Sequence, residues 1–365
     1  MKATNPTIVL TIALIVLVLG LTARGWGPLI FMRVPGAVRS GPAAALLLLL
    51  AAGALVRWAR LNARRRRVRL AFTNSIPRAA IEKIARDPAL LSLKGETRDV
   101  TYLACGVRGL DELAAAFHGD PKGFTLLLEQ VLTPLMSQTL KHGGIIDRLT
   151  TDGFTAYWNA PLDDVDHALH ACEAASAMVA AMAGVNGELA ATHTLDGLPA
   201  VEIGIGIATG AVFAGGFTGP ERLNYSVNGD TVRLAARLQA QSRHYGHAVI
   251  VMEETQTHAA RGFAFLEVDY ISPSREDPPI RLYAVLDNRI TWASPKIRAL
   301  TTFHEHIFQS LKARQWDKAR ALVGQCRRLS GACQTLYDLY LTRIGDLESN
   351  PPGPDWDGAF RPIPE

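Results

Sequence analysis

The chain has 365 residues, of which 48% are hydrophobic and 20% are charged, and its formal net charge at pH 7 is +4. That length is enough for one or two domains with cores of their own. A net charge this small gives no argument for a nucleic-acid partner, and many of the basic residues are clustered in one stretch, residues 57–69. The cysteines form no CxxC pair and lack metal-ligand spacing, which favours reduced thiols: Cys105, Cys172, Cys326 and Cys333.

Two apolar segments within residues 1–60 predict a membrane region. Residues 3–23 contain no charged residue, and neither do residues 40–56. The first is long enough for an α-helix to cross a bilayer, and the second is at the short end of that range. We therefore expect two transmembrane helices, at about residues 5–23 and 40–57. The alternative for the first segment is a cleaved signal peptide, since a lysine precedes the apolar stretch and a Leu-Thr-Ala motif follows it.

A basic cluster follows the second apolar segment and includes four consecutive arginines, Arg64–Arg67. Arginines beside a membrane end favour the cytoplasmic side, so we expect everything after the membrane region to lie in the cytoplasm. The same cluster is expected to contact anionic lipid head groups. It opens a connector, residues 61–98, in which Ile81 and Ile84 have helical spacing after Pro77.

From Val100 the pattern becomes mixed α and β. An apolar run of strand length, residues 100–105, breaks at Gly106, and a helical pattern starts near Asp111. A strand that ends in a glycine-containing turn before a helix is a common place to bind phosphate, because backbone N–H groups point at the anion. We therefore predict a phosphate-binding turn made of three residues: Val107, Arg108 and Gly109.

The remaining elements follow in chain order: one or two helices within residues 112–142, a hairpin at 145–158, a helix at 164–183, a strand at 201–210, a helix at 231–242 and a strand at 247–253. This order favours an α+β fold in which helices cover one face of an antiparallel sheet. After residue 290 the strands stop. Three short helices and a turn-rich, proline-rich tail are expected there: 303–311, 316–329, 335–347 and 349–358.

Four stretches together resemble the class III nucleotidyl cyclases, the adenylate and guanylate cyclase catalytic domain. They are VTYLACGVRGL, HGGIIDRLTTDGFTAYWNAP, VEIGIGIATG with GPERLNYSVNGDTVRLAARL, and YGHAVIVMEET. Their order and spacing match over about residues 95–287. The resemblance implies a ferredoxin-like cyclase domain at 99–288, preceded by the two transmembrane helices and followed by a C-terminal helical region and tail at 289–365.

The flanks are similar to those of bacterial receptor-type cyclases, including the NPPGPDWDG tail. This resemblance implies a multi-pass protein of the bacterial inner membrane whose cyclase-like domain faces the cytoplasm. An extracytoplasmic sensor domain often precedes the helices in such proteins. Here that role would fall to a separate sensor protein.

Cyclisation of a nucleoside triphosphate needs two divalent ions held by carboxylates, which activate the ribose 3′-hydroxyl and hold the triphosphate. A cation must meet the charge that develops on the phosphoryl group, and polar groups must contact the base. In the family these groups come from both subunits of a dimer. The resemblance therefore implies Mg²⁺ or Mn²⁺ as cofactor, a nucleoside triphosphate as ligand, and a homo- or heterodimer.

Only part of the family's site is kept in this sequence. The resemblance implies a metal ligand at Asp152 and a transition-state arginine at Arg237. The other metal aspartate of the family falls on Gly106, and the transition-state asparagine falls on Arg233. The two base-contacting positions are also changed or only partly matched: Arg148 stands where the family has lysine, and Ser226 stands where it has Asp or Thr.

These replacements favour one function over two alternatives. The preferred hypothesis is a membrane-anchored cyclase homologue with a degenerate site that acts as a dimer partner or regulator in cyclic-nucleotide (cAMP) signalling. The first alternative is an adenylate cyclase that converts ATP to cAMP and diphosphate, alone or in a heterodimer. The second is a sensor that binds a nucleotide without chemistry, which the extra cations Arg148 and Arg233 favour.

Overall fold

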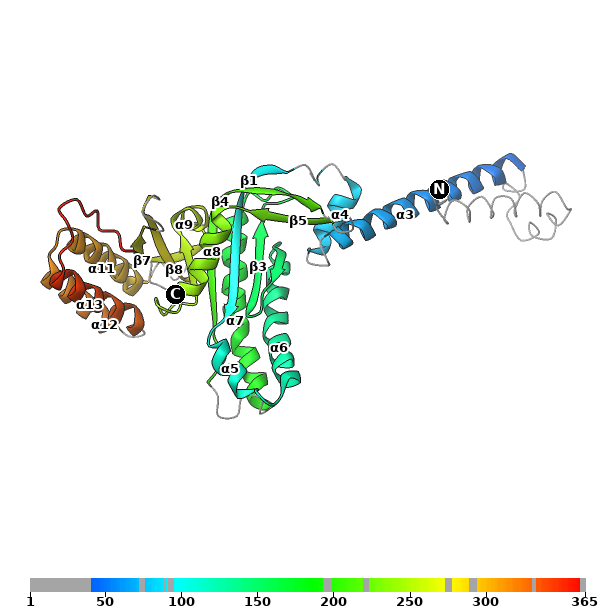
Figure 1. Ribbon diagram of the computed structural model, residues 1–365. Coiled ribbons are helices and arrows are strands. Elements are labelled where there is room, and N and C mark those ends of the chain that lie inside the picture. Colours follow the sequence, from blue (N-terminus) through cyan, green and yellow to red (C-terminus); the bar gives the residue numbers. More distant parts are fainter. Residues whose placement is uncertain are drawn as a thin grey trace. The chain divides into compact units, whose positions relative to one another are not determined.

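The computed structural model describes residues 41–71, 76–87, 90, 95–192, 199–218, 223–272, 278–288, 294–329 and 333–361 (Figure 1). The chain forms two compact units. One comprises Met1–Ala71 and Arg78–Ala89, and the other comprises Phe72–Pro77 and Leu90–Glu365. The first predicted transmembrane segment, at about residues 5–23, lies outside the described residues.

The smaller unit contains two described helices, α3 (Gly41–Ala71) and α4 (Arg78–Arg86). The predicted helix near residue 80 is therefore confirmed. An ion pair of 2.6 Å between Arg65 Nη2 and Glu82 Oε2 joins α3 to α4. Among the described residues, the one helix long and apolar enough to cross a membrane is α7 (His167–Ala191) in the larger unit. Ten of its side chains are buried in the fold, so α7 is a core helix.

The larger unit is built on an eight-stranded sheet with the order β2-β3-β1-β4-β6-β8-β7, and β5 pairs with β4. The strands have these bounds: β1 Glu96–Val107, β2 Ile145–Leu149, β3 Gly153–Trp158, β4 Ile203–Thr218, β5 Leu223–Asn228, β6 Val249–Met252, β7 Phe263–Ile271 and β8 Ile280–Asn288. The predicted α+β class is confirmed. The prediction of a purely antiparallel sheet is wrong at one place, because β4 and β6 are parallel.

The described helices of the sheet-containing region are α5 Leu110–Ala116, α6 Pro121–Lys141, α7, α8 Asp230–Gln241 and α9 Glu253–Ala259. Three isoleucines of β4, at positions 203, 205 and 207, lie in a core cluster with buried residues of α6 and α7. The glycines between them face α8 instead: a Cβ at Gly206 would lie 2.2 Å from the carbonyl oxygen of Ala235.

The prediction that helices cover one face of the sheet is therefore wrong. Side chains alternate between the two faces of a strand, so α8 lies on the face opposite α6 and α7. Because the α8 face of β4 has glycines at positions 204 and 206, the helix backbone contacts the strand directly there. This close contact fixes where the end of α8 lies relative to the end of β1.

Within the described residues, three helices follow the sheet, as the sequence predicts: α11 Pro295–Lys312, α12 Trp316–Arg327 and α13 Gln334–Ser349. They dock on β7 through buried polar contacts. Arg343 of α13 makes two hydrogen bonds, of 2.8 and 2.9 Å, to the carboxylate of Asp269, which is fully buried. Tyr245, in the loop after α8, donates a further bond of 2.6 Å to Asp269.

His304 of α11 is also buried in this contact. Its Nδ1 lies 2.7 Å from the carbonyl oxygen of Glu267, and its Nε2 lies 3.0 Å from the hydroxyl of Tyr337. A neutral imidazole satisfies both, since Nδ1–H donates to the carbonyl and Nε2 accepts from the hydroxyl. Burial lowers the pKa of His304 to about 4.

Replacing Arg343 with leucine is expected to lower the free energy of unfolding by about 3–5 kcal/mol, because Asp269 would be left buried and uncompensated. Denaturant unfolding monitored by circular dichroism measures this change. Arg320→Leu is the matched control: its partners Asp317 and Glu348 are exposed, so its loss should cost less than about 1 kcal/mol. Equal effects of the two substitutions would contradict the stabilising role of the buried Arg343–Asp269 pair.

Protonation of His304 is expected to destabilise the fold in acid. The pKa is lowered in the folded chain, so below pH 6.5 the unfolded chain binds more protons. Above pH 6.5 the neutral imidazole makes its full contribution to the free energy of unfolding. This contribution falls, by up to about 3 kcal/mol, as the pH drops towards 4. Denaturant unfolding between pH 7 and pH 4 measures this slope, and His304→Gln should make it less steep. An unchanged slope in that variant would contradict the assignment.

Candidate active site

The strand pair β1–β3 brings the two predicted metal-ligand positions together. Gly106 pairs with Gly153, the residue after Asp152, and the amide of Val107 donates a 2.8 Å bond to the carbonyl oxygen of Asp152. A Cβ built on Gly106 would lie 3.1 Å from Oδ2 of Asp152. A carboxylate at position 106 would therefore lie beside that of Asp152, as two-ion chemistry requires. Of these two carboxylates the chain supplies only that of Asp152.

The turn after β1 differs from the sequence prediction. The strand continues through Gly106 to Val107, and the turn consists of Arg108 and Gly109, whose φ of 64° is a left-handed conformation that suits glycine. The amide of Arg108 donates to the carbonyl oxygen of Glu202 at 2.8 Å, just as that of Val107 donates to Asp152. A phosphate would have to displace these bonds, so phosphate binding by this turn remains a prediction.

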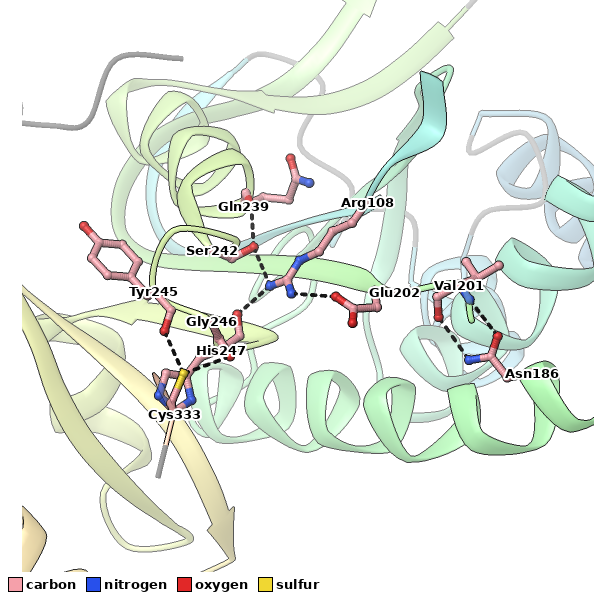
Figure 2. A network of polar contacts seen from close by, with 10 residues as sticks. All are labelled: Arg108, Asn186, Val201, Glu202, Gln239, Ser242, Tyr245, Gly246, His247 and Cys333. Carbon is pink, nitrogen blue, oxygen red and sulfur yellow. Dashed lines mark hydrogen bonds and ion pairs between the residues drawn. The ribbon is translucent and has the colours of Figure 1, made fainter. Parts of the chain in front are cut away.

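The side chain of Arg108 holds the end of α8 (Figure 2). Its guanidinium contacts Glu202 at 3.3 Å, the hydroxyl of Ser242 at 3.1 Å and the carbonyl oxygen of His247 at 2.6 Å. Ser242 in turn donates a 2.7 Å bond to the carbonyl oxygen of Gln239. Arg108 thus ties β1 to the segment that follows α8, a role that its position in the predicted turn did not indicate.

The segment after α8 also contacts the C-terminal helices. The thiol of Cys333, at the start of α13, lies 3.4 Å from the carbonyl oxygens of Tyr245 and Gly246 (Figure 2). Burial, and then the charge of Arg108, lowers the pKa of His247 in the same segment to about 4, which keeps its imidazole neutral at pH 7. Residues 242–247 therefore connect the candidate site to the C-terminal region.

The two predicted base-contacting residues meet at a carboxylate that the sequence did not single out. Asp147 of β2 has a side chain that is 1% exposed, and it accepts bonds from Ser226 at 2.5 Å and from Tyr102 at 2.8 Å. The exposed side chain of Arg148 approaches it at 3.3 Å. Ser226 is thus engaged within the chain, and burial together with Asp147 raises the pKa of Tyr102.

The predicted transition-state positions, Arg233 and Arg237, lie one helical turn apart on α8 and are both exposed. Arg233 forms an ion pair with Asp230 in the first turn of the helix. Arg233 puts a positive charge near Arg237, where the family has a neutral asparagine. The carboxylate of Asp230 supplies the negative charge that such a cation needs beside it. Position 233 therefore carries an arginine that already contacts a residue of its own helix.

The donor set at this site does not suit two divalent ions. Asp152 is half-buried, Gly106 has no side chain, and no group of three or more His, Cys, Asp or Glu side chains among the described residues could hold a metal ion. Cys105 adds no ligand, because burial raises the pKa of its thiol and Asp152 raises it further. A thiol binds metals as the thiolate.

Comparison with known proteins gives the class of this domain. Residues 94–273 match the family model described as the Adenylate and Guanylate cyclase catalytic domain. Adenylate cyclase 1 of Rhizobium meliloti (strain 1021) is 33% identical over 131 residues, which cover 36% of this chain and 19% of that protein. The adenylate cyclase of Anabaena cylindrica is 29% identical over 194 residues, which cover 52% of this chain and 37% of that protein.

Solved structures give further matches. The guanylyl cyclase Cya2 has a TM-score of 0.48 and 25% identity, covering 55% of this chain and 97% of that one. The adenylyl cyclase CyaB from P. aeruginosa has the same TM-score and identity, covering 54% and 98%.

The family model and the curated relatives identify residues 94–273 as a class III adenylate and guanylate cyclase catalytic domain. Domains of this class work as dimers and generally use Mg²⁺ or Mn²⁺. The chain spans well under half the length of the two curated relatives described above. What the whole protein does is therefore a separate question.

Replacing Arg108 with methionine is expected to lower the free energy of unfolding by about 2 kcal/mol, because several hydrogen bonds to a charged, largely buried group are lost. Hydrogen exchange should also become faster in residues 239–247. Exchange followed by mass spectrometry measures the second effect. Arg243→Met, an exposed change in the same segment, is the control and should stay within about 0.5 kcal/mol. Unchanged exchange in the Arg108 variant would contradict the role given to this side chain.

Proposed function

We propose that this protein is a membrane-anchored cyclase homologue with a degenerate site, which acts as a dimer partner or regulator in cyclic-nucleotide signalling. The observation that carries the proposal is the pairing of β1 with β3. It brings Gly106 to the place beside Asp152 where a second metal carboxylate would stand. One carboxylate supports two-ion chemistry poorly, because each ion needs anionic oxygen ligands.

The expected loss of rate is large. Removing one preorganised transition-state contact costs about 10²–10³ in rate, and losing a metal ligand costs at least as much by the same reasoning. Losses at residues that act together need not add. Even so, Gly106 and Arg233 replace two such groups on one chain, and Arg233 is engaged by Asp230.

Membrane anchoring is supported by the apolar N-terminal sequence and by one described helix. Four large apolar side chains of α3 are exposed: Leu49, Leu50, Leu55 and Trp58. Arginines follow them along the same helix, as expected for a segment that leaves a bilayer on its cytoplasmic side. We propose a multi-pass protein of a bacterial inner membrane, with the cyclase domain in the cytoplasm.

The alternative is an adenylate cyclase that is active alone or in a heterodimer. Two observations favour it: Asp152 and Arg237 keep the family's residue types, and the two curated relatives compared above are adenylate cyclases. In a heterodimer, the exposed Arg237 of this chain would serve a site whose metal carboxylates come from the partner.

The full-length protein in native membranes is expected to form no cyclic AMP or cyclic GMP with Mg²⁺ or Mn²⁺ above the level of an Asp152→Ala, Arg237→Ala control. Co-expression with a related cyclase that has a complete site should change that cyclase's rate whether or not Asp152 is intact. Turnover by the protein alone that depends on Asp152 would overturn the proposal. Turnover of the pair that depends on Arg237 would favour the heterodimeric enzyme instead.

A further inference from the structure

The side chain of Gln239 reaches the space beside Asp152 that a side chain at position 106 would enter. Gly106 of β1 pairs with Gly204 of β4, so both lie on the sheet face that α8 covers. A Cβ at Gly206 would lie 2.3 Å from the backbone nitrogen of Gln239, which shows how closely this turn of α8 approaches the sheet. Gln239 therefore stands directly over the end of β1.

The amide of Gln239 and the carboxylate of Asp152 border the same small volume. A Cβ built on Gly106 would lie 2.5 Å from Nε2 of Gln239 and 3.1 Å from Oδ2 of Asp152. Any side chain at position 106 would have to share this space with the amide. A carboxamide nitrogen is a neutral hydrogen-bond donor, and an ionised carboxylate is an acceptor, so the two groups are chemically complementary.

We propose that the Gln239 carboxamide takes the place of the divalent cation in this chain, so that Asp152 is stabilised without a metal ion. The inference rests on the proposed degenerate function and deepens it. Two carboxylates side by side repel each other unless a cation lies between them. With glycine at position 106 and an amide donor from α8, a single negative charge remains, which a neutral donor can satisfy.

Glycine at position 106 leaves open the space that the amide of Gln239 enters. Arg108 keeps Gln239 in place, because it bonds Ser242, whose hydroxyl donates to the carbonyl oxygen of Gln239 (Figure 2). Arg108 follows directly on the predicted metal position and, in this chain, positions the amide that we assign to the place of the metal ion. Among the described residues, no group of three or more His, Cys, Asp or Glu side chains forms a metal site there.

Mn²⁺ binding to the full-length protein, measured by electron paramagnetic resonance, tests the inference. The wild-type protein is expected to show no Mn²⁺ binding that depends on Asp152. Gln239→Glu keeps the size of the side chain and places a second carboxylate beside Asp152. This variant should bind Mn²⁺ at least about tenfold more tightly than the wild type, and Asp152→Asn should abolish the gain.

Gln325→Glu adds the same charge at an exposed position of α12 and is the matched control, with no gain expected. If Gln239→Glu fails to fold, the double variant Gly106→Asp, Gln239→Ala supplies the carboxylate from β1 instead. Wild-type Mn²⁺ binding that Asp152→Asn removes would overturn the inference, and so would a folded Gln239→Glu protein that gains no binding.

The metal measurement and the cyclase assay can fail separately. Wild-type turnover without Mn²⁺ binding at Asp152 would overturn the proposed function and leave the role of Gln239 intact. An inactive wild type that binds Mn²⁺ through Asp152 would do the reverse.

Discussion

The close packing of α8 against the glycines of β4 determines the geometry of this site. Isoleucines at alternate positions of β4 bury one face of the strand against α6 and α7, and Gly204 and Gly206 leave the other face free for the helix backbone. A side chain at Gly206 would meet the backbone of α8 within 2.3 Å, which no relaxation of a side-chain tip relieves. The positions of Arg233, Arg237 and Gln239 all follow from this contact.

The segment after α8 joins the site to the rest of the larger unit. Arg108 bonds it from the end of β1, and Tyr245 anchors it to the fully buried Asp269, which Arg343 of α13 compensates. Two buried nitrogens of this support, Nε of Arg108 and Nε2 of His247, have no hydrogen-bond partner among the described residues. The support therefore rests on the bonds named above.

Much of the fold could be predicted because its signals are local. The hairpin β2–β3, the strands β1 and β4, and the helices α7 and α8 follow from apolar periodicity, although β1 begins four residues before and ends two residues after the predicted run. Strands β5, β7 and β8 were missed, because they are interrupted by polar residues whose burial depends on neighbouring strands. The parallel pairing of β4 with β6 and the two-sided placement of helices are non-local as well, although the Ile-Gly alternation of β4 gave a usable signal.

The site was predictable as a set of positions but not as a set of contacts. The family resemblance assigned Gly106 and Asp152 to the two metal positions, and the structure brings these positions together. Three facts depend on distant segments and had no local signal: Asp147 engages Ser226, Arg108 holds the end of α8, and Gln239 reaches Gly106. Each joins residues more than 75 positions apart, where periodicity carries no information.

This chain offers one metal carboxylate where two-ion chemistry needs two. Anomalous diffraction from crystals of the protein soaked with Mn²⁺ and a non-hydrolysable nucleoside triphosphate measures how many ions bind there. We expect no pair of manganese peaks beside Asp152, with the Gln239 amide over Gly106. Two manganese peaks bridged by Asp152 in the wild-type protein would show that the site holds both ions without a second carboxylate at position 106, and would refute the degenerate site.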